Sequence, residues 1–504
     1  MASAAGGQSS KGRVFIAGAG LAGCTFARIL VDSGYDVIMA DCGGQHSRLP
    51  GENLKNFHNY QADVDQFGAV VRGLMHPVSI PPHKGAAYTR NALNPRQRED
   101  RNLPGAVVAY AIGGMAVHWT CAIPRQHETE RAGFIDDQEW DRLYTEAERM
   151  MNINRDVRSG SVRHQVLKAF LEEQGEPVRE TPLAAERRTA EFVYHTGADT
   201  ILGELAEPGA SSRLSLLAEH RVSHLERQGG RVMSARVRNL RTGEDSNIEA
   251  DIYVAAAGWL HSAQILWNSH IMRDEDSALG RYLHDHLFTG CQVVLGPEIL
   301  KRIGQISGGG SSGPDELPIP MEDPAPHLYL PVDHGRPWHG MMFREAFQFD
   351  QFAPDVDDRL IVDFKWFGMI DTVRTNRVTF EPDIFDRFGM PQPTFDFQLG
   401  AEDKDRLEKM MADMQRVAKM IGGYAPKGDP MYVPLGASTH TMGATRMGPA
   451  NDGTSVVNPN SQVWDFDNLY VAGNNVLPTP NACNPTPTSL ALAIKAARHI
   501  VGRS

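Results

Sequence analysis

A glycine-rich turn near the start of the chain constrains its fold more than any other feature. Gly18, Gly20 and Gly23 have the spacing Gly-x-Gly-x-x-Gly and directly follow a short apolar run, residues 14–17. The first glycine allows a tight turn, the second lets backbone approach a pyrophosphate, and the third permits close packing of helix on strand. The spacing therefore predicts a nucleotide-binding turn between a buried strand and a helix.

A complete β-α-β unit surrounds this turn. Apolar residues at helical spacing continue to about Gly34, and the apolar run 37–39 is the next predicted strand. This strand ends at Asp41, where a carboxylate can accept hydrogen bonds from ribose hydroxyls. Parallel strands joined in this way predict a buried sheet with helices on its faces. The motif is compatible with FAD or NAD, and an Asp at position 41 only disfavours a 2′-phosphate.

Similar elements recur in the middle and at the end of the chain. Strand-like runs at 232–237 and 247–254 precede a helix from about Ser262, and a strand at 468–473 precedes a helix from Thr488. We therefore expect an α/β fold with a discontinuous Rossmann-like nucleotide-binding domain and a second domain interleaved with it. The expected ranges are 13–130, 190–292 and 436–504 for the first domain, 131–189 and 293–435 for the second, and 1–12 for a flexible tail.

Composition excludes several classes of function. A chain of 504 residues is long enough for about three domains or two large interleaved ones, and a formal charge of -12 argues against a nucleic-acid partner. The five cysteines are scattered without C-x-x-C spacing, so we expect neither a zinc knuckle nor a dithiol centre, and no metal site. No apolar run resembles a signal peptide or a membrane span, which predicts a cytoplasmic protein without a membrane partner.

Several longer motifs identify a family. The segment GGMAVHWTC at 113–121 resembles a segment of the pyranose oxidases, which belong to the glucose–methanol–choline (GMC) oxidoreductases. The segments FREAFQF at 343–349, GMPQPTF at 389–395 and ACNPT at 482–486 are also similar to that group. The resemblance runs in order from about residue 13 to 501. The chain is shorter than the fungal pyranose oxidases and is similar in size to compact bacterial relatives, some of which oxidise glycosides, including C-glycosides, at ring carbon 3.

The resemblance implies FAD as the cofactor. It also implies a discontinuous FAD domain and a substrate domain of α+β type built on a mostly antiparallel sheet. In this family a histidine and an asparagine lie over the flavin, and His440 and Asn484 match that pair. A neutral imidazole can take the proton of a substrate hydroxyl, while an asparagine amide can hydrogen-bond the same oxygen and fix its geometry.

Further cofactor contacts follow from the same likeness. His118 matches a position where histidine can bond covalently to the flavin methyl group, although Val117 replaces the family's threonine just before it. Thr120 matches a residue near the flavin edge, where a hydroxyl could tune the reaction with dioxygen. A helix beginning near residues 485–488 would direct its N–H groups at the flavin pyrimidine ring, with Thr486 in its first turn.

The expected substrate loop carries Glu345, Phe347 and Phe349, the last in place of a tyrosine. A carboxylate can bind sugar hydroxyls, and aromatic faces pack on sugar C–H surfaces. The expected substrate is thus a small sugar or glycoside, oxidised at a secondary ring hydroxyl of carbon 2 or carbon 3, with hydride passing to flavin and dioxygen reduced to hydrogen peroxide.

Other readings remain open from the sequence. A dehydrogenase could use the same scaffold and pass electrons to a quinone or a protein carrier. An NAD-only dehydrogenase would be colourless when purified, because it has no flavin. A non-catalytic flavin-binding or interaction protein would be favoured if a His440→Ala variant kept full turnover. Peroxide formation with glucose or a glycoside distinguishes the oxidase from these alternatives.

Overall fold

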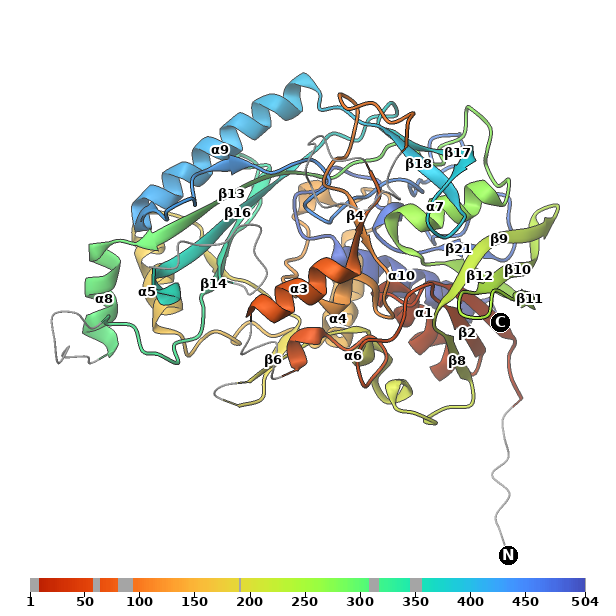
Figure 1. Ribbon diagram of the computed structural model, residues 1–504, viewed down its shortest axis with the longest axis horizontal. Coiled ribbons are helices and arrows are strands. Elements are labelled where there is room, and N and C mark those ends of the chain that lie inside the picture. Colours follow the sequence, from red (N-terminus) through yellow and green to blue (C-terminus); the bar gives the residue numbers. More distant parts are fainter. Residues whose placement is uncertain are drawn as a thin grey trace, which may run out of the picture.

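The computed structural model describes residues 9–57, 64–79, 94–189, 192–307, 317–344 and 356–503. Two large sheets of different character form its framework (Figure 1). One is parallel and lies at the end of the molecule that contains both ends of the described chain, while the other is antiparallel. The predicted combination of a Rossmann-like sheet with a mostly antiparallel second sheet is confirmed.

The parallel sheet carries the predicted nucleotide-binding turn. Its strand order is β21-β12-β1-β2-β8, and all of its neighbouring pairs are parallel. The strands are β1 (Arg13–Ala17), β2 (Asp36–Ala40), β8 (Leu214–Leu217), β12 (Ile252–Ala255) and β21 (Leu469–Val471). Central strand β1 is buried along its apolar length, as a parallel strand covered on both faces must be.

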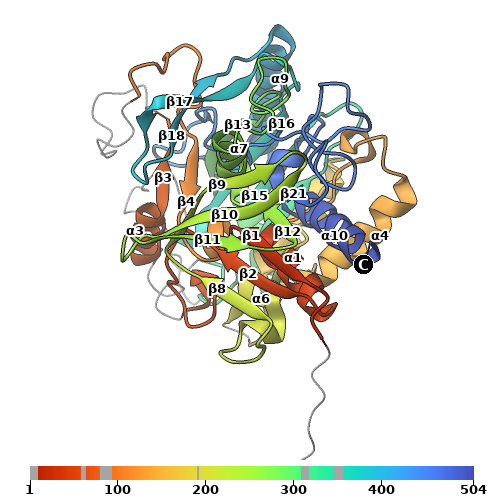
Figure 2. The ribbon, with the colours of Figure 1, turned by 90° about the vertical axis from the view of Figure 1, so that its right-hand side faces the viewer.

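Helices and a small sheet cover the two faces of the parallel sheet (Figure 2). Helix α1 (Leu21–Asp32) packs against α10 (Thr486–Gly502), which also contacts α4 (Asp137–Met150). The other side carries α7 (Gly258–Asn268) and a three-stranded antiparallel sheet. That sheet consists of β9 (His220–Gln228), β10 (Arg231–Asn239) and β11 (Asp245–Glu249).

The prediction of one strand over 247–254 is wrong. Strand β11 ends at Glu249 and β12 begins at Ile252, in a different sheet. Between them the Asp251 N–H donates to the carbonyl of Arg13 (2.9 Å), and the Arg13 N–H donates to the Asp251 carboxylate (2.8 Å). These bonds turn the chain toward β1, a change of sheet that apolar patterning alone does not reveal.

The antiparallel sheet has the order β19-β13-β16-β15-β14-β5, and β20 also pairs with β13. Its strands are β5 (Arg179–Glu180), β13 (His286–Leu295), β14 (His327–Leu330), β15 (Trp338–Phe343), β16 (Ile361–Met369), β19 (Gly422–Tyr424) and β20 (Met431–Tyr432). The long helix α9 (Ala401–Ile421) packs on β13 and β16 (Figure 1). Its buried apolar side chains recur at helical spacing: Met410, Met411, Met414, Val417, Ala418 and Ile421.

Shorter elements complete the described part of the chain. The helices are α3 (Val64–Leu74), α5 (Val162–Glu173), α6 (Ala198–Leu202) and α8 (Pro297–Ser307), with short 3-10 turns that include η3 (Gly114–Val117) and η4 (Glu128–Glu130). Paired strands are β3 (Met75–Pro77) with β4 (Val107–Ala109), β6 (Ala185–Arg187) with β7 (Val193–His195), and β17 (Arg377–Phe385) with β18 (Pro391–Asp396). None of the helices in the described ranges combines the length and apolar character needed to cross a bilayer.

Strand β13 bears on the expected domain limits. It spans residues 286–295 and pairs with β16 in the antiparallel sheet, so the expected limit after residue 292 falls inside a strand. We propose that the limit lies just before β13, with the division into two interleaved domains otherwise as expected. Of the expected tail, residues 1–8 lie outside the described part, while the Lys11 N–H donates to the carbonyl of Gly34 (3.1 Å).

Candidate active site

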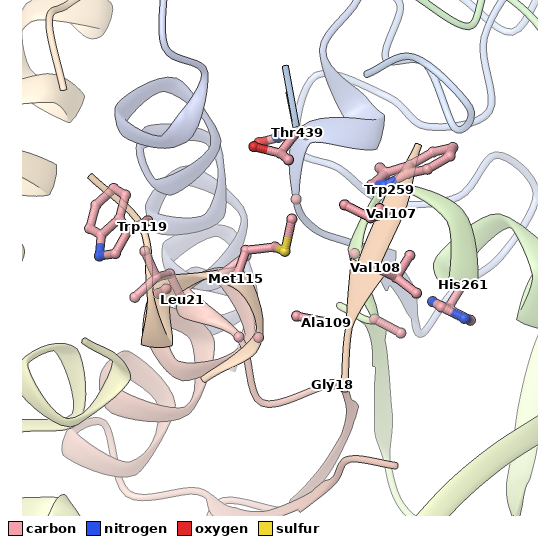
Figure 3. A pocket seen from close by; sticks show the side chains of 18 of the residues that line it. Gly18, Leu21, Val107, Val108, Ala109, Met115, Trp119, Trp259, His261 and Thr439 are labelled. Carbon is pink, nitrogen blue, oxygen red and sulfur yellow. The ribbon is translucent and has the colours of Figure 1, made fainter. Parts of the chain in front are cut away.

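One continuous pocket joins the beginning and the end of the chain. Its lining includes the predicted residues Gly18, Gly20, Asp41, His118, Thr120, His440, Asn484 and Thr486. In Figure 3, Gly18 lies at one end and Thr439 at the other, with the Met115 side chain between them. Residues far apart in sequence thus surround a single pocket, as a site shared by a dinucleotide and a small substrate requires.

Each glycine of the turn meets a different steric demand. Gly18 has φ +107°, and a Cβ on it would lie 2.3 Å from the carbonyl oxygen of Ala256. A Cβ on Gly23, which lies outside the pocket lining, would be 2.2 Å from the Gly18 oxygen. A Cβ on Gly20 would have no backbone neighbour nearer than 3.9 Å, because that residue faces the open pocket. Gly20 therefore leaves room for a ligand, whereas Gly18 and Gly23 permit the turn itself.

Asp41 lies in the pocket lining directly after β2, as predicted. One carboxylate oxygen accepts from the Ala19 N–H (2.8 Å) and the other from the Gly43 N–H (2.7 Å). Burial raises the pKa of Asp41, and these two bonds oppose that rise. Each oxygen keeps a second lone pair for a ribose hydroxyl. Asp41 therefore fixes the glycine turn in addition to any contact with a ligand.

The segment 113–121 forms one wall of the pocket. Gly113 has φ +98°, and the short turn η3 then presents His118, Trp119 and Thr120 to the pocket. The Nε2 atom of His118 is buried and has no hydrogen-bond partner among the described residues. Burial, with a smaller contribution from Lys55, lowers the pKa of His118 to about 4. Its neutral ring is thus available to a ligand in the pocket.

A buried carboxylate holds the loop that presents His440. Asp285, just before β13, accepts from the Gly436 N–H (2.8 Å) and from the Ser438 hydroxyl. The Ser438 oxygen in turn accepts from the His440 N–H (3.0 Å). Burial raises the pKa of Asp285 to about 6. Thr439 has φ +62°, a conformation that a β-branched residue adopts only when its surroundings enforce it.

His440 is an uncharged imidazole with a free nitrogen. Its Nδ1 is buried and has no partner among the described residues. Its ring lies edge-on to His286 at 4.9 Å between centroids and 5.6 Å from Phe367. Burial and then His339 lower the pKa of His440 to about 3. Near neutral pH the ring is therefore neutral and can accept a proton.

A second buried carboxylate holds the backbone just before Asn484. Glu130 of η4 accepts from the N–H groups of Ala482 (2.7 Å) and Cys483 (3.0 Å), and its other oxygen accepts from the His127 N–H (2.7 Å). Burial raises the pKa of Glu130 to about 7, while these bonds oppose the rise. Asn484 is buried, and its Oδ1 has no partner among the described residues. The backbone before Asn484 is thus fixed while its amide oxygen stays available.

Helix α10 begins at Thr486, near the predicted position, with Pro487 in its first turn. Thr486, Ser489 and Leu490 line the pocket, so the N-terminus of this helix faces it. The Ser489 hydroxyl donates to the Asn474 side-chain oxygen (2.5 Å). The unpaired N–H groups of this first turn favour negative charge in the adjacent part of the pocket.

The antiparallel sheet supplies a wall that the sequence did not predict. Phe288, Met341, Phe343, Lys365 and Phe367 line the pocket from three adjacent strands. Phe367 pairs with Phe288 and stacks on it at 4.6 Å between ring centroids, and the Lys365 ammonium lies 5.0 Å from the centre of the Phe343 ring. Lys365 and Phe367 are two residues apart on β16, so the sequence indicates that they share one face of the strand. That this face lines the pocket follows only from the register across the neighbouring strands.

The opposite end of the pocket holds another unpredicted group. Tyr110 contacts His261 through a hydrogen bond of 3.1 Å, and its ring lies edge-on to Phe388 at 4.6 Å. Arg221 and Asp386 line the same region. Phe388 and Asp386 belong to the turn between β17 and β18, which therefore closes this end near the glycine turn. The predicted substrate residues Glu345, Phe347 and Phe349 lie outside the described residues.

Comparisons with known proteins agree with this arrangement. The GMC oxidoreductase family models match residues 125–288 and 372–493. The chain is 38% identical to a pyranose 2-oxidase from Tricholoma matsutake, with 97% of this chain and 93% of that protein covered. It is 32% identical to a C-glycoside 3-oxidase from Microbacterium trichothecenolyticum, with 97% and 96% covered.

The fold is shared with solved structures of low sequence identity. A pyridoxine 4-oxidase from Mesorbium loti superposes with a TM-score of 0.66 at 17% identity, covering 97% of this chain and 98% of the other. The open glycine turn and the unpaired buried atoms of His118 and Asn484 provide a site that a flavin dinucleotide fits. The chain belongs to the GMC oxidoreductase family, and its cofactor is FAD.

Proposed function

We propose that this protein is a sugar or glycoside oxidase that converts a secondary ring hydroxyl, at carbon 2 or carbon 3, to a ketone and delivers the electrons to dioxygen, forming hydrogen peroxide. The observation that carries this proposal is that His440 and Asn484 line the same pocket as the FAD-binding glycine turn. Relatives named pyranose 2-oxidase and C-glycoside 3-oxidase, matched over 97% of the chain, support the substrate class.

His440 would act as the base. Bound FAD supplies the hydride acceptor. The pKa of His440, about 3, means that the imidazole is neutral before substrate arrives. It can then take the hydroxyl proton as the carbon loses its hydride. The bonds from Asp285 through Ser438 hold this loop, so the ring needs little reorganisation when the substrate binds.

Asn484 and helix α10 would supply orientation and electrostatic stabilisation. The Asn484 amide would hydrogen-bond the same substrate oxygen, and the first turn of α10 would favour negative charge on the bound cofactor. Thr486 lies in that turn. We further propose that Thr120 and His118, which line the pocket, would both contact bound flavin, His118 with or without a covalent bond.

The antiparallel sheet would form the substrate side of the pocket. Phe288 and Phe367 offer apolar faces for sugar C–H groups, and Lys365 can donate to hydroxyls. Glu345, Phe347 and Phe349 are proposed to complete this side. The ring carbon that reacts depends on how the sugar lies against this wall, because His440 can serve either hydroxyl.

Dioxygen is the proposed acceptor because the sugar-oxidising relatives are named oxidases. A dehydrogenase that uses a quinone or a protein carrier is the alternative. The cytoplasmic location stays a prediction.

Product analysis tests the proposal. The FAD-loaded protein would be incubated with glucose and with a C-glycoside while peroxide is measured and the product is identified by NMR. We expect a 2-keto or 3-keto sugar with one peroxide for each sugar oxidised. Oxidation of the sugar only when a quinone is added, with no peroxide formed, would support the dehydrogenase. No oxidation of any sugar or glycoside would refute the proposed substrate class.

A further inference from the structure

A group of metal-binding side chains lies on the surface, outside the pocket. His127, Glu128 and His334 each offer one donor atom, and these atoms all lie within 4.8 Å of one another. Two come from the start of η4 and the third from the turn between β14 and β15. We propose that these three side chains bind one divalent transition-metal ion, with zinc as the ion that fits best.

The donor spacing already approaches that of a metal site. The Nε2 atom of His334 lies 3.4 Å from the Oε1 atom of Glu128. Tetrahedral zinc with bonds of about 2.1 Å to nitrogen and oxygen places its ligands about 3.4 Å apart. The imidazoles of His127 and His334 are nearly perpendicular, at 86°, with centroids 5.3 Å apart. Small side-chain rotations would therefore bring all three donors onto one ion.

Backbone structure holds both donor segments. His334 is one of two residues at the tip of a tight turn, closed by reciprocal backbone bonds between Asp333 and Arg336 (3.1 Å each). His127 caps η4, and its Nδ1 lies 2.9 Å from the Thr129 hydroxyl oxygen. In the cap, Nδ1 accepts from the Thr129 N–H (3.4 Å); metal binding at Nε2 would move the ring proton to Nδ1, which would then donate to the Thr129 hydroxyl oxygen instead. Such an outer partner is typical of metal-binding histidines.

The chemistry of the three donors selects the ion. Two imidazoles and one carboxylate suit zinc and similar transition metals, whereas calcium and magnesium prefer oxygen ligands alone. The side chains of His334 and Glu128 are 75% and 68% exposed, so solvent can reach the ion and supply its fourth ligand. The competing explanation is a simple surface ion pair, which contributes little to stability and needs no metal.

Bound metal would connect two segments that lead to the proposed active site. Within η4, Glu130 holds the backbone before Asn484. The turn that carries His334 continues into β15, which contributes Met341 and Phe343 to the pocket wall. The ion would therefore link η4, which holds the backbone before Asn484, to the turn that leads into β15 and the pocket wall. The metal site itself does not depend on the proposed reaction.

Zinc titration of the FAD-loaded, tag-free protein, after treatment with a chelator, tests the site. We expect calorimetry to show one saturable ion per chain, and His334→Ala to weaken its binding by about tenfold or more. Glu128→Gln should have the same effect. The matched control is His224→Ala, because His224 forms an exposed pair with Glu226 at 2.8 Å without belonging to the three-donor group.

Cobalt provides a second readout that does not depend on affinity alone. Co²⁺ at this site should give the visible absorption of a four- or five-coordinate ion, which His334→Ala removes and His224→Ala keeps. Absence of saturable zinc binding to the unmodified protein would overturn the proposal. So would equal stoichiometry and affinity in His334→Ala, since the ion would then bind elsewhere.

Discussion

His440 lies among groups that give its imidazole no counter-charge. His286, His339 and Phe367 surround it, and the first two have lowered pKa values themselves because of burial. A protonated His440 would therefore be poorly solvated and unpaired. The site holds the residue as a base by making its charged form unfavourable.

This environment predicts an unusual pH dependence. The pKa of His440 is about 3, and the neutral form is the active one, so protonation of His440 should not reduce kcat/KM between pH 7 and about pH 5. Initial rates with saturating dioxygen would show this. An acid limb near pH 6.5, the ordinary value for histidine, that disappears when His440 is replaced would contradict the assignment.

The glycine turn gives a second prediction at this scale. Gly20→Ala adds a methyl group that the fold accommodates but that projects into the pocket, so we expect FAD to bind about tenfold more weakly or worse while thermal stability without FAD is preserved. Gly18→Ala should instead lower that stability, because its Cβ would clash with the Ala256 oxygen at positive φ. Equal FAD affinity for Gly20→Ala and the unmodified protein would show that Gly20 does not approach the cofactor.

At the scale of elements, two buried carboxylates position the two proposed catalytic residues. Asp285 holds the loop of His440 from the start of β13, and Glu130 holds residues 482–483 from η4. Each accepts backbone or hydroxyl hydrogen bonds instead of pairing with a cation. Loops tied in this way can be irregular and still rigid, because their N–H groups are satisfied internally.

Replacing Glu130 tests this arrangement. Glu130→Leu leaves the buried N–H groups of Ala482 and Cys483 and the half-buried one of His127 without this acceptor, so Asn484 should shift and kcat should fall by about 10²-fold, with FAD still bound. Glu130→Gln is the matched control, since its amide oxygen can still accept from Ala482 and Cys483 while the bond from His127 is lost. A Glu130→Leu protein that folds, binds FAD and keeps full kcat would show that Glu130 does not position the site.

The same elements show what sequence can and cannot predict here. The glycine turn and Asp41 were predictable because their roles depend on residues close in sequence. His440 and Asn484 were found only through a family resemblance, since nothing local distinguishes one histidine from another. Lys365 and Phe367 were missed because their shared orientation depends on register across three strands. The apolar run at 247–254 concealed a change of sheet made by Asp251.

At the scale of the whole molecule, the pocket is assembled from the first, middle and last parts of the chain. The parallel sheet contributes the FAD end, and the antiparallel sheet contributes the wall beside His440. Many histidines of this molecule are kept neutral because burial lowers their pKa values. Those with lowered pKa values include His76, His118, His164, His195, His261, His284, His286, His327, His339, His440 and His499.

The lowered pKa values of these histidines predict that the folded protein becomes less stable in acid. Below their ordinary pKa of about 6.5 they take up protons on unfolding, so stability falls as pH falls, by about 1.4 kcal/mol per pH unit for each extra proton bound by the unfolded chain. Glu130 and Asp285 act in the opposite direction, because their raised pKa values of about 7 and about 6 favour protons in the folded state. Burial also raises the pKa values of Asp41, Glu52, Asp199 and Asp363, which act in the same direction as these two. The histidines outnumber them. Urea unfolding should show lower stability at about pH 5 than at about pH 7; equal or greater stability at the lower pH would contradict this.

The most direct test of the central claim is the rate of flavin reduction without dioxygen. Stopped-flow absorbance would follow the FAD-loaded protein after mixing with a sugar or glycoside that it oxidises, alongside His440→Ala and the exposed control His270→Ala. We predict that the flavin colour bleaches in the unmodified protein and in His270→Ala, and that His440→Ala bleaches about 10²- to 10⁴-fold more slowly with its FAD content unchanged. Bleaching of His440→Ala at the unmodified rate would contradict the account.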